Sequence, residues 1–258
     1  MNNYKKKVVA ITRPFNRIDE AIDILTSYNA QAFIAPTLEL KLVNSPSLKK
    51  LISKLDKMNC LIFTSITTVE SIFQFYPDFK NRLTNKTKIV AIGTKTAEKL
   101  NEHNLNVDVI PDNFTAEGII ESFKKISIKD NLIGIPRTLD ARLILPEKLK
   151  ELGANVLIAE AYKSILPMDT VRVEVLIAKI LNNEIDAITF TSPLTVKNLF
   201  KILPIDQKYE FVNKLSTSTL TVSIGPITHQ TLEEFNINSI YPSKYTVKAM
   251  FELLFETL

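Results

Sequence analysis

Hydroxyl side chains and two arginines are the groups best placed for chemistry, because each stands where an apolar, strand-like segment gives way to a helical segment. In a parallel sheet such turns share one edge, beyond the carboxyl ends of the strands, where open α/β sheets bind ligands. Helix-start N–H groups and arginines there would suit an anionic small molecule, although a single Ser or Thr at a helix start also serves as an N-cap. The candidate residues are Arg13, Thr64, Ser65, Gly93, Thr96, Arg137, Thr191, Ser192, Pro193, Gly225 and Thr228.

The composition excludes several kinds of catalytic site. Glycine occurs only 5 times in 258 residues, and the five positions are too widely spaced for any glycine-rich phosphate loop. A single cysteine, Cys60, and two histidines, His103 and His229, cannot form a cysteine-based zinc site or a three-histidine centre. Neither histidine follows a strand end, so no Ser-His-Asp triad is predicted. The remaining class is an enzyme that positions a reactive ligand, with no metal and no cofactor.

The net charge and the hydropathy of the sequence indicate which kinds of binding partner and which cellular compartment to expect. The net charge of +4 is mild and scattered, whereas nucleic-acid binding favours a dense basic patch. No apolar run approaches the roughly 18 residues of a membrane span, and the apolar run before Thr12 is too short for a signal peptide. We therefore expect a cytoplasmic, monomeric protein that binds a small molecule and neither nucleic acid nor membrane.

The elements that must position these residues alternate between strand and helix. Short, continuously apolar runs are typical of parallel strands covered on both faces, and helical periods lie between most of them. The alternation predicts an α/β fold with parallel sheets. The predicted strands are Val8–Thr12, Gln31–Ala35, Cys60–Thr64, Ile89–Ile92, Val107–Ile110, Leu132–Ile135, Val156–Ala161, Ala187–Phe190, Thr221–Ile224 and Ser239–Tyr241.

The sequence contains an internal repeat. FTSITTVESIF (63–73) matches FTSPLTVKNLF (190–200) at six of eleven positions, and VAIGTKTAEKLNE (90–102) matches VSIGPITHQTLEE (222–234) at six of thirteen. Further downstream, Pro111, Thr115 and Ala116 align with Pro242, Thr246 and Val247. Two copies of one five-strand unit are therefore predicted.

Two divisions of the chain accommodate the repeat. The copies are either sequential halves that meet near residue 125, or a central domain, 46–160, inserted into a discontinuous domain of 1–36 and 168–258. We favour the second division, because it explains why 37–45 and 161–167 carry polar residues unlike the buried strands: both would cross between the domains as a two-stranded linker. Domains that faced each other edge to edge would line a cleft with the candidate residues.

The motifs together resemble those of the uroporphyrinogen-III synthase family over essentially the whole chain. They are FTSxxTVxxxF, present twice, AIGxxTAxxL, PxxxTAEG, RxxxARxxL followed by LGAxV and Tyr, and SIGPxT near the end. The resemblance implies two flavodoxin-like parallel-sheet domains, one of them discontinuous, joined by a two-stranded β-ladder. It also implies cyclisation of the linear tetrapyrrole hydroxymethylbilane to uroporphyrinogen III, with inversion of ring D, loss of water and no cofactor.

The resemblance assigns roles residue by residue. Tyr162 is expected to help the ring A hydroxyl depart, by donating a proton or a hydrogen bond. Thr96, Thr228, Ser65 and Ser192 are expected to bind substrate carboxylates or pyrrole N–H groups. The chain departs from the family pattern at two positions: Ile227 stands where many members carry a threonine, and Leu220 where some carry a lysine.

Three alternatives remain open at this point. A non-catalytic ligand-binding or regulatory protein could use the same scaffold. A two-lobed solute-binding protein would need a secretion signal, and a nucleotide-binding enzyme is weakened by the missing glycine loop.

Overall fold

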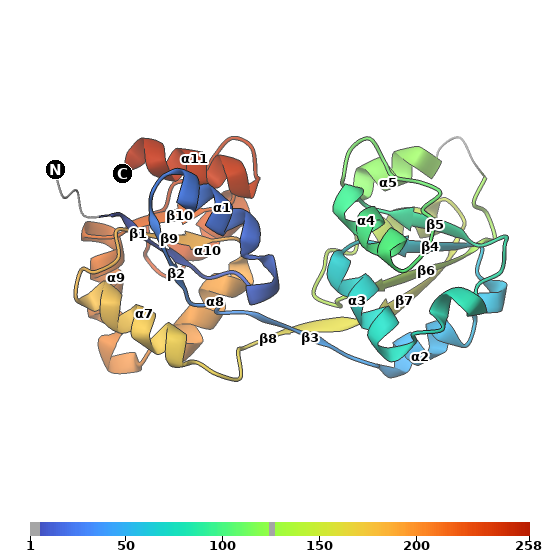
Figure 1. Cartoon of the computed structure of the whole chain (residues 1–258), viewed down its shortest axis with the longest axis horizontal. Helices are drawn as coiled ribbons and strands as arrows, with labels where there is room; N and C mark the ends of the chain where they lie inside the picture. Colours follow the sequence, from blue (N-terminus) through green and yellow to red (C-terminus); the bar gives the residue numbers. More distant parts are fainter. Residues whose placement is uncertain (1–5, 124–126) are drawn as a thin grey trace. The chain divides into compact units, whose positions relative to one another are not determined.

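The computed structural model describes residues 6–123 and 127–258. They divide into two compact α/β units (Figure 1). Unit 1 contains the described residues up to Glu39 together with Ile165–Leu258, and unit 2 contains Leu40–Ser164. Among the described residues, no helix combines the length and the apolar character that crossing a bilayer requires.

Unit 1 is built on a parallel four-stranded sheet in the order β10-β9-β1-β2. The strands are β1 (Val8–Ile11), β2 (Gln31–Ile34), β9 (Ala187–Phe190) and β10 (Leu220–Ser223). The helices are α1 (Asp19–Ser27), α7 (Val171–Leu181), α8 (Pro193–Ile202), α9 (Lys208–Thr217), α10 (Pro226–Glu233) and α11 (Val247–Thr257), with 3-10 turns η1 (Phe15–Arg17) and η4 (Ile205–Gln207).

Unit 2 has a parallel four-stranded sheet in the order β5-β4-β6-β7. The strands are β4 (Cys60–Phe63), β5 (Lys88–Ala91), β6 (Leu132–Arg137) and β7 (Asn155–Glu160). The helices are α2 (Pro46–Ile52), α3 (Ile66–Phe75), α4 (Thr94–Glu102), α5 (Ala116–Phe123) and α6 (Ile144–Glu151), with 3-10 turns η2 (Leu55–Lys57) and η3 (Phe79–Arg82).

The strand orders confirm the predicted fold class, including the internal repeat and the discontinuous unit. In the repeat, β9 corresponds to β4, β10 to β5, β1 to β6 and β2 to β7, so the two sheets have the same spatial order. Only the chain order differs, because unit 1 begins with β1 and β2 whereas unit 2 begins with β4 and β5. Unit 1 is therefore a circular permutation of unit 2.

A two-stranded sheet of β3 (Glu39–Leu42) and β8 (Tyr162–Ile165) forms the predicted ladder. The Val43 N–H extends it by donating to the Ala161 carbonyl at 3.0 Å. Each strand contains one of the two points where the chain passes from one unit to the other. The finer boundaries of the linker, 37–45 and 161–167, stay a prediction.

Equivalent anchors hold the two crossing segments where they leave their sheets. In unit 1 the Thr37 N–H donates to the Thr12 carbonyl at 3.0 Å, and the buried Asn198 amide donates to the Thr37 carbonyl at 2.8 Å. In unit 2 the Ala161 N–H donates to the Arg137 carbonyl at 2.9 Å, and the buried Ser71 hydroxyl donates to the Ala161 carbonyl. Asn198 and Ser71 occupy matching positions of the repeat, on α8 and α3.

Two predicted strands, Val107–Ile110 and Ser239–Tyr241, were wrong as strands. Each is reduced to a single bridge, Val90 with Val109 and Val222 with Ile240. In a parallel ladder every second residue faces the same neighbour, so the next donors would be residues 111 and 242. Both are prolines and have no N–H, so the ladder cannot continue.

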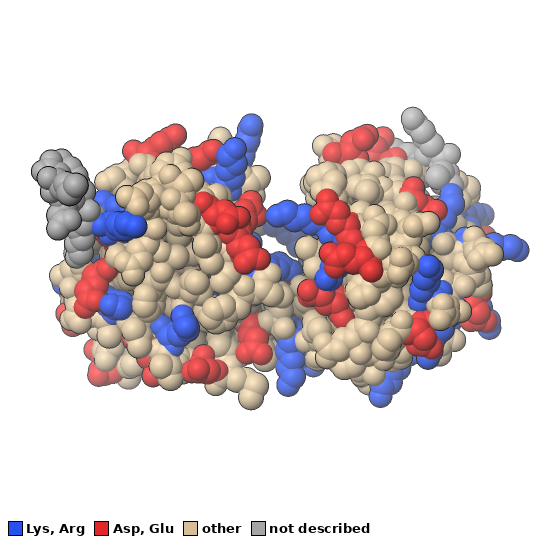
Figure 2. Space-filling view, viewed as in Figure 1, with Lys and Arg blue, Asp and Glu red and all other residues tan. Residues whose placement is uncertain are grey.

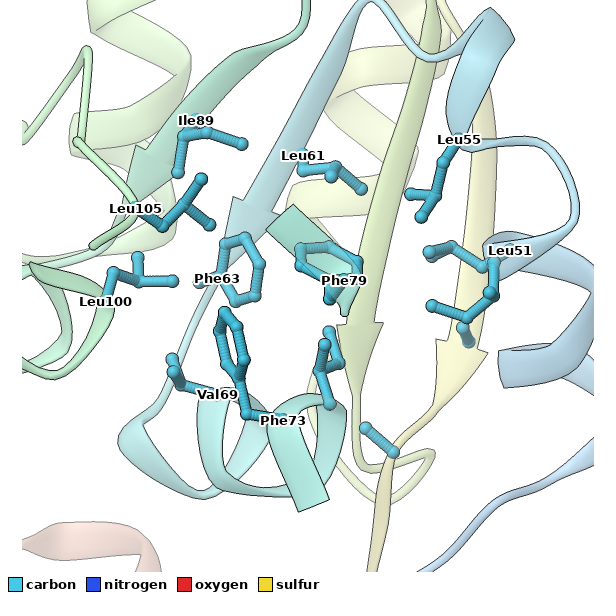
Figure 3. Packing of buried hydrophobic residues seen from close by; sticks show 14 of the residues in the cluster. Leu51, Leu55, Leu61, Phe63, Val69, Phe73, Phe79, Ile89, Leu100 and Leu105 are labelled. Carbon is cyan, nitrogen blue, oxygen red and sulfur yellow. The ribbon is translucent and has the colours of Figure 1, made fainter. Parts of the chain in front are cut away.

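Aromatic residues of strand and helix form the core on one face of the unit 2 sheet (Figure 3). Phe63 of β4 is fully buried and meets Phe79 edge to face, with ring centroids 6.3 Å apart. Phe73 of α3 meets Phe79 in the same manner at 5.7 Å. Phe190 of β9, the repeat partner of Phe63, is also fully buried, in the core of unit 1.

Truncation of Phe63 tests the weight of this cluster. Phe63→Ala is expected to lower the free energy of unfolding by about 3–5 kcal/mol, because it removes buried ring area and leaves a cavity. Urea unfolding followed by circular dichroism measures the change. Tyr209→Ala, at a side chain 88% exposed, is the matched control and should change the free energy by less than about 0.5 kcal/mol. A similar loss in both variants would contradict the assignment.

Candidate functional site

Matching serines begin the helices that follow the central strands of the two sheets. Ser65 lies between β4 and α3, and Ser192 lies between β9 and α8. Their backbones are nearly identical, with φ/ψ of −164°/155° and −165°/157°. Each hydroxyl accepts a hydrogen bond at 3.3 Å from the N–H three residues on. Both serines are therefore N-caps. They are half-buried and lie at the carboxyl edge of their sheets.

Three neighbours of these serines are also half-buried at the same two turns. Thr64 and Thr191 each directly follow a central strand and precede the capping serine. Pro193 occupies the first turn of α8, where its missing N–H costs no helical hydrogen bond. The sequence-predicted groups at these turns thus lie together within each unit, at one edge of the sheet.

The neighbouring strands end in a second pair of matching turns. Gly93 and Gly225 are the N-cap residues of α4 and α10, in extended conformation and with no side-chain cap. Thr96 and Thr228 lie in the first turn of these helices and are 5% and 2% exposed. Their backbone N–H groups donate to the Gly93 and Gly225 carbonyls at 3.2 Å. These threonines are therefore part of the packed helix start and are less accessible than Ser65 and Ser192.

The two arginines are equivalent in the repeat but differ in their partners; Arg13 follows β1 and Arg137 is the last residue of β6. Arg137 is buried, and its guanidinium donates to the Thr138 carbonyl at 3.1 Å and to the Arg142 carbonyl at 2.7 Å. Arg13 is half-buried, and among the described residues its buried Nε and Nη1 atoms have no hydrogen-bond partner. Burial lowers the pKa of both guanidinium groups. Two buried donor atoms of Arg13 are thus without a hydrogen-bond partner among the described residues, whereas Arg137 holds its own loop.

Tyr162 is the first residue of β8 and is only 8% exposed. Its ring packs in the same apolar cluster as Phe63, and its phenol interacts electrostatically with the Arg137 guanidinium. Within the part of the chain that the structure describes, the phenol makes no hydrogen bond. A buried phenol beside a cation, with its own proton uncommitted, is able to donate a hydrogen bond to a ligand oxygen.

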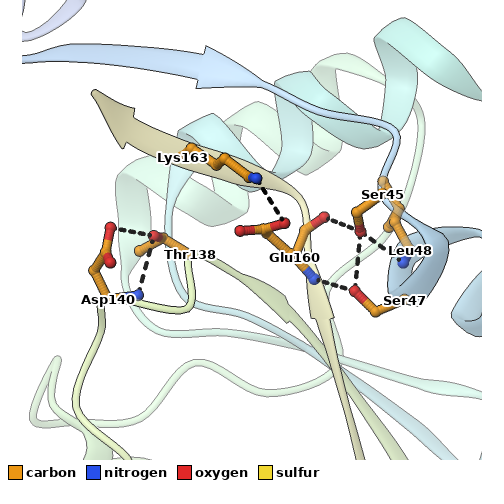
Figure 4. Close-up of polar contacts among 7 residues, drawn as sticks. All are labelled: Ser45, Ser47, Leu48, Thr138, Asp140, Glu160 and Lys163. Atoms are coloured by element: carbon orange, nitrogen blue, oxygen red, sulfur yellow. Dashed lines mark hydrogen bonds and ion pairs between the residues drawn. The ribbon is translucent and has the colours of Figure 1, made fainter. Parts of the chain in front are cut away.

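Polar contacts that sequence reasoning missed hold the backbone just before Tyr162 (Figure 4). The Ser45 hydroxyl caps α2 through the Leu48 N–H at 3.0 Å and donates to the Glu160 carbonyl at 2.7 Å. The Glu160 N–H donates to the Ser47 hydroxyl at 2.9 Å. The only sequence signal was Ser45 before Pro46, a typical helix start, which does not reveal the distant partner.

Neither the charge distribution in Figure 2 nor a cluster of metal-binding side chains among the described residues marks a further ligand site. On the face in Figure 2, basic and acidic side chains are interspersed over both units. Across residues 6–123 and 127–258, no three His, Cys, Asp or Glu side chains are grouped to hold a metal ion. The polar groups described at the sheet edges are hydroxyls, helix-start N–H groups and the Arg13 guanidinium, and the Tyr162 phenol lies at the start of β8.

Comparison with known proteins confirms the resemblance drawn from the motifs. The family model described as uroporphyrinogen-III synthase HemD matches residues 19–252. A putative uroporphyrinogen-III synthase of Methanothermobacter thermautotrophicus is 42% identical over 95% of this chain and 96% of its own length. One of Methanocaldococcus jannaschii is 32% identical over 95% and 97%, respectively.

Solved structures show the same fold. The crystal structure of uroporphyrinogen-III synthetase from Helicobacter pylori aligns with a TM-score of 0.67 at 20% identity, over 98% of this chain and all of that one. A mutant uroporphyrinogen III synthase from Thermus thermophilus aligns with a TM-score of 0.61 at 18% identity, over 97% of both chains.

The different environments of the two arginines predict different effects of their loss. Arg137→Met is expected to lower the free energy of unfolding by about 2–4 kcal/mol, because it removes charged hydrogen bonds to two carbonyls. Arg13→Met is expected to leave it unchanged or raise it, because the buried Nε and Nη1 atoms make no hydrogen bonds that the substitution would remove. Urea unfolding of the two variants side by side measures this, and equal losses would contradict the distinction.

Proposed function

Since the chain belongs to the uroporphyrinogen-III synthase family, we propose that it cyclises hydroxymethylbilane to uroporphyrinogen III, with inversion of ring D and loss of water. The observation that carries the proposal is the family match over residues 19–252, together with 42% identity to a putative synthase over almost the whole chain. Family membership supports a place in tetrapyrrole biosynthesis. The proposal includes a cytoplasmic, monomeric lyase that works without a cofactor.

The proposed substrate suits the groups at the sheet edges. Hydroxymethylbilane carries many carboxylates, and each unit offers helix starts and hydroxyls that bind anions. We assign carboxylate and pyrrole N–H binding to the predicted set, with Arg13 as the strongest anion-binding group, because its buried donors lack partners among the described residues. Arg137 is assigned a supporting role, since two of its donors are used by its own loop.

Tyr162 is proposed to assist departure of the ring A hydroxyl. As the carbon–oxygen bond breaks, the bonding pair leaves with the oxygen and the phenol transfers its proton to that oxygen, so that water departs. The pyrrole N–H proton of ring A then passes to the phenolate, which restores the phenol and leaves ring A as the azafulvene. The Arg137 guanidinium interacts electrostatically with this phenol, so a positive charge lies beside the proposed proton donor. The Ser45, Ser47 and Ser71 contacts fix the backbone on which the ring is mounted.

The activity itself is tested with freshly prepared hydroxymethylbilane. Hydroxymethylbilane closes spontaneously to the type I isomer, so the ratio of type III to type I product, measured after oxidation to porphyrins, reports catalysis. We expect predominantly type III product in the presence of the protein. Type I product alone would reject the synthase and favour a binding or regulatory protein on the same scaffold.

The role of Tyr162 is tested by removing its hydroxyl. Tyr162→Phe is expected to lower the rate of type III formation by about 10²-fold, the usual contribution of a positioned proton donor. Tyr76→Phe is the matched control, because it removes an exposed phenol that donates to Asn44 at 2.7 Å in the same unit. Full activity of Tyr162→Phe would leave the tyrosine only its packing role in β8.

A further inference from the structure

Two exposed aromatic residues occupy the same position in the two copies of the repeat. Thr115 aligns with Thr246, so Phe114 aligns with Tyr245. Phe114 lies just before α5 and Tyr245 just before α11, in the loops that follow the single-bridge segments. The loops differ in sequence around them, DNFTAEG against SKYTVKA, yet each places an aromatic residue directly before the threonine.

Both rings rest against a glycine at the carboxyl edge of the sheet. A Cβ atom on Gly93 would lie 3.2 Å from Cγ of Phe114, and one on Gly225 would lie 3.1 Å from Cδ1 of Tyr245. Either contact is tighter than a side chain normally makes, so with a larger residue in place of the glycine the ring would have to shift by a few tenths of an ångström. Two of the 5 glycines in the chain therefore lie against an aromatic ring at a helix start.

Burial does not explain why these residues are aromatic. Phe114 is 56% exposed and Tyr245 is 60% exposed, so more than half of each side chain still faces water. A residue that only covered the glycine turn could be aliphatic. The glycines, the repeat and the exposure together point to a flat apolar surface that is kept open beside each of the helix starts α4 and α10.

We propose that Phe114 and Tyr245 are stacking surfaces for pyrrole rings of the tetrapyrrole. The inference rests on the proposed function and adds residues that the motif resemblance did not assign. A pyrrole ring bearing carboxylate arms needs a flat apolar contact next to anion-binding groups. Each aromatic ring provides that contact. The helix starts beneath the rings provide first-turn N–H groups for the arms, that of Thr94 in α4 and that of Ile227 in α10, where Pro226 has none.

Substitutions can separate stacking from simple covering of the turn. Phe114→Leu and Tyr245→Leu keep apolar bulk over the glycine but remove the aromatic face. Phe114→Tyr and Tyr245→Phe keep the face. Tyr209→Leu removes a tyrosine that is 88% exposed on α9 and serves as the control.

The experiment measures KM and kcat with hydroxymethylbilane and, separately, the dissociation constant of uroporphyrin III by its fluorescence. Each leucine variant is expected to raise KM and the dissociation constant roughly tenfold, with kcat and urea unfolding close to those of the parent. The aromatic exchanges and Tyr209→Leu should stay within about twofold. If a leucine variant is unstable, the corresponding methionine variant takes its place and carries the same expectation.

The outcomes distinguish this inference from the proposed reaction. If the parent makes type III product but the leucine variants bind like the parent, or if the aromatic exchanges lose as much as leucine, stacking is overturned and the synthase stands. If the parent makes only type I product but binds uroporphyrin III through Phe114 and Tyr245, the reaction is overturned and stacking stands. A parent that neither converts hydroxymethylbilane nor binds uroporphyrin III overturns both.

Discussion

The requirement that buried backbone groups find hydrogen-bond partners governs how the chain leaves each sheet. Thr37 and Ala161 are the points of departure, and each is held through both its N–H and its carbonyl. The carbonyl partners are Asn198 and Ser71, which are buried side chains at the same position of the repeat. A buried carbonyl without a hydrogen-bond partner lowers the stability of the fold. The same kind of anchor therefore stands at the start of both crossing segments, although the order of the strands along the chain differs between the two copies. The ladder of β3 and β8 starts from these anchors.

The permuted repeat explains why matching groups gather at the same edge in both units. Both sheets are parallel and have the same strand order, so the residues that follow matching strands occupy matching places. Pro111 and Pro242 end the fifth strand after one bridge in each copy. After each proline the chain continues as a loop, in which Phe114 packs against Gly93 in one copy and Tyr245 packs against Gly225 in the other. In each unit, the proline that lacks an N–H and the glycine that lacks a side chain therefore act on the same loop and helix start.

The two copies have diverged where polar groups take partners. The Arg137 guanidinium donates hydrogen bonds to two carbonyls of its own loop and interacts with Tyr162. Two buried donor atoms of Arg13, by contrast, have no partner among the described residues. On the proposed function, Arg13 is the anion-binding group assigned to unit 1 and Tyr162 is the proton donor assigned to unit 2. The two copies share one strand order, and the residues that differ between them set which polar groups at each edge have partners.

The sequence by itself determined the parallel α/β class and the repeat, because hydrophobic runs and internal identities can be read from the residues alone. It favoured the discontinuous unit over two sequential halves, and the strand orders of the two sheets decided between them. The sequence also placed Ser65 and Ser192 at helix starts. Only the tertiary structure decided that 107–110 and 239–241 make single bridges, since strand pairing sets which residues must donate, and prolines stand at those places. It alone decided which hydroxyls cap helices, and it alone decided that Arg137 is satisfied and Arg13 is not. The physical reason is that a hydrogen-bond partner or a neighbouring ring is set by packing, which no local pattern encodes.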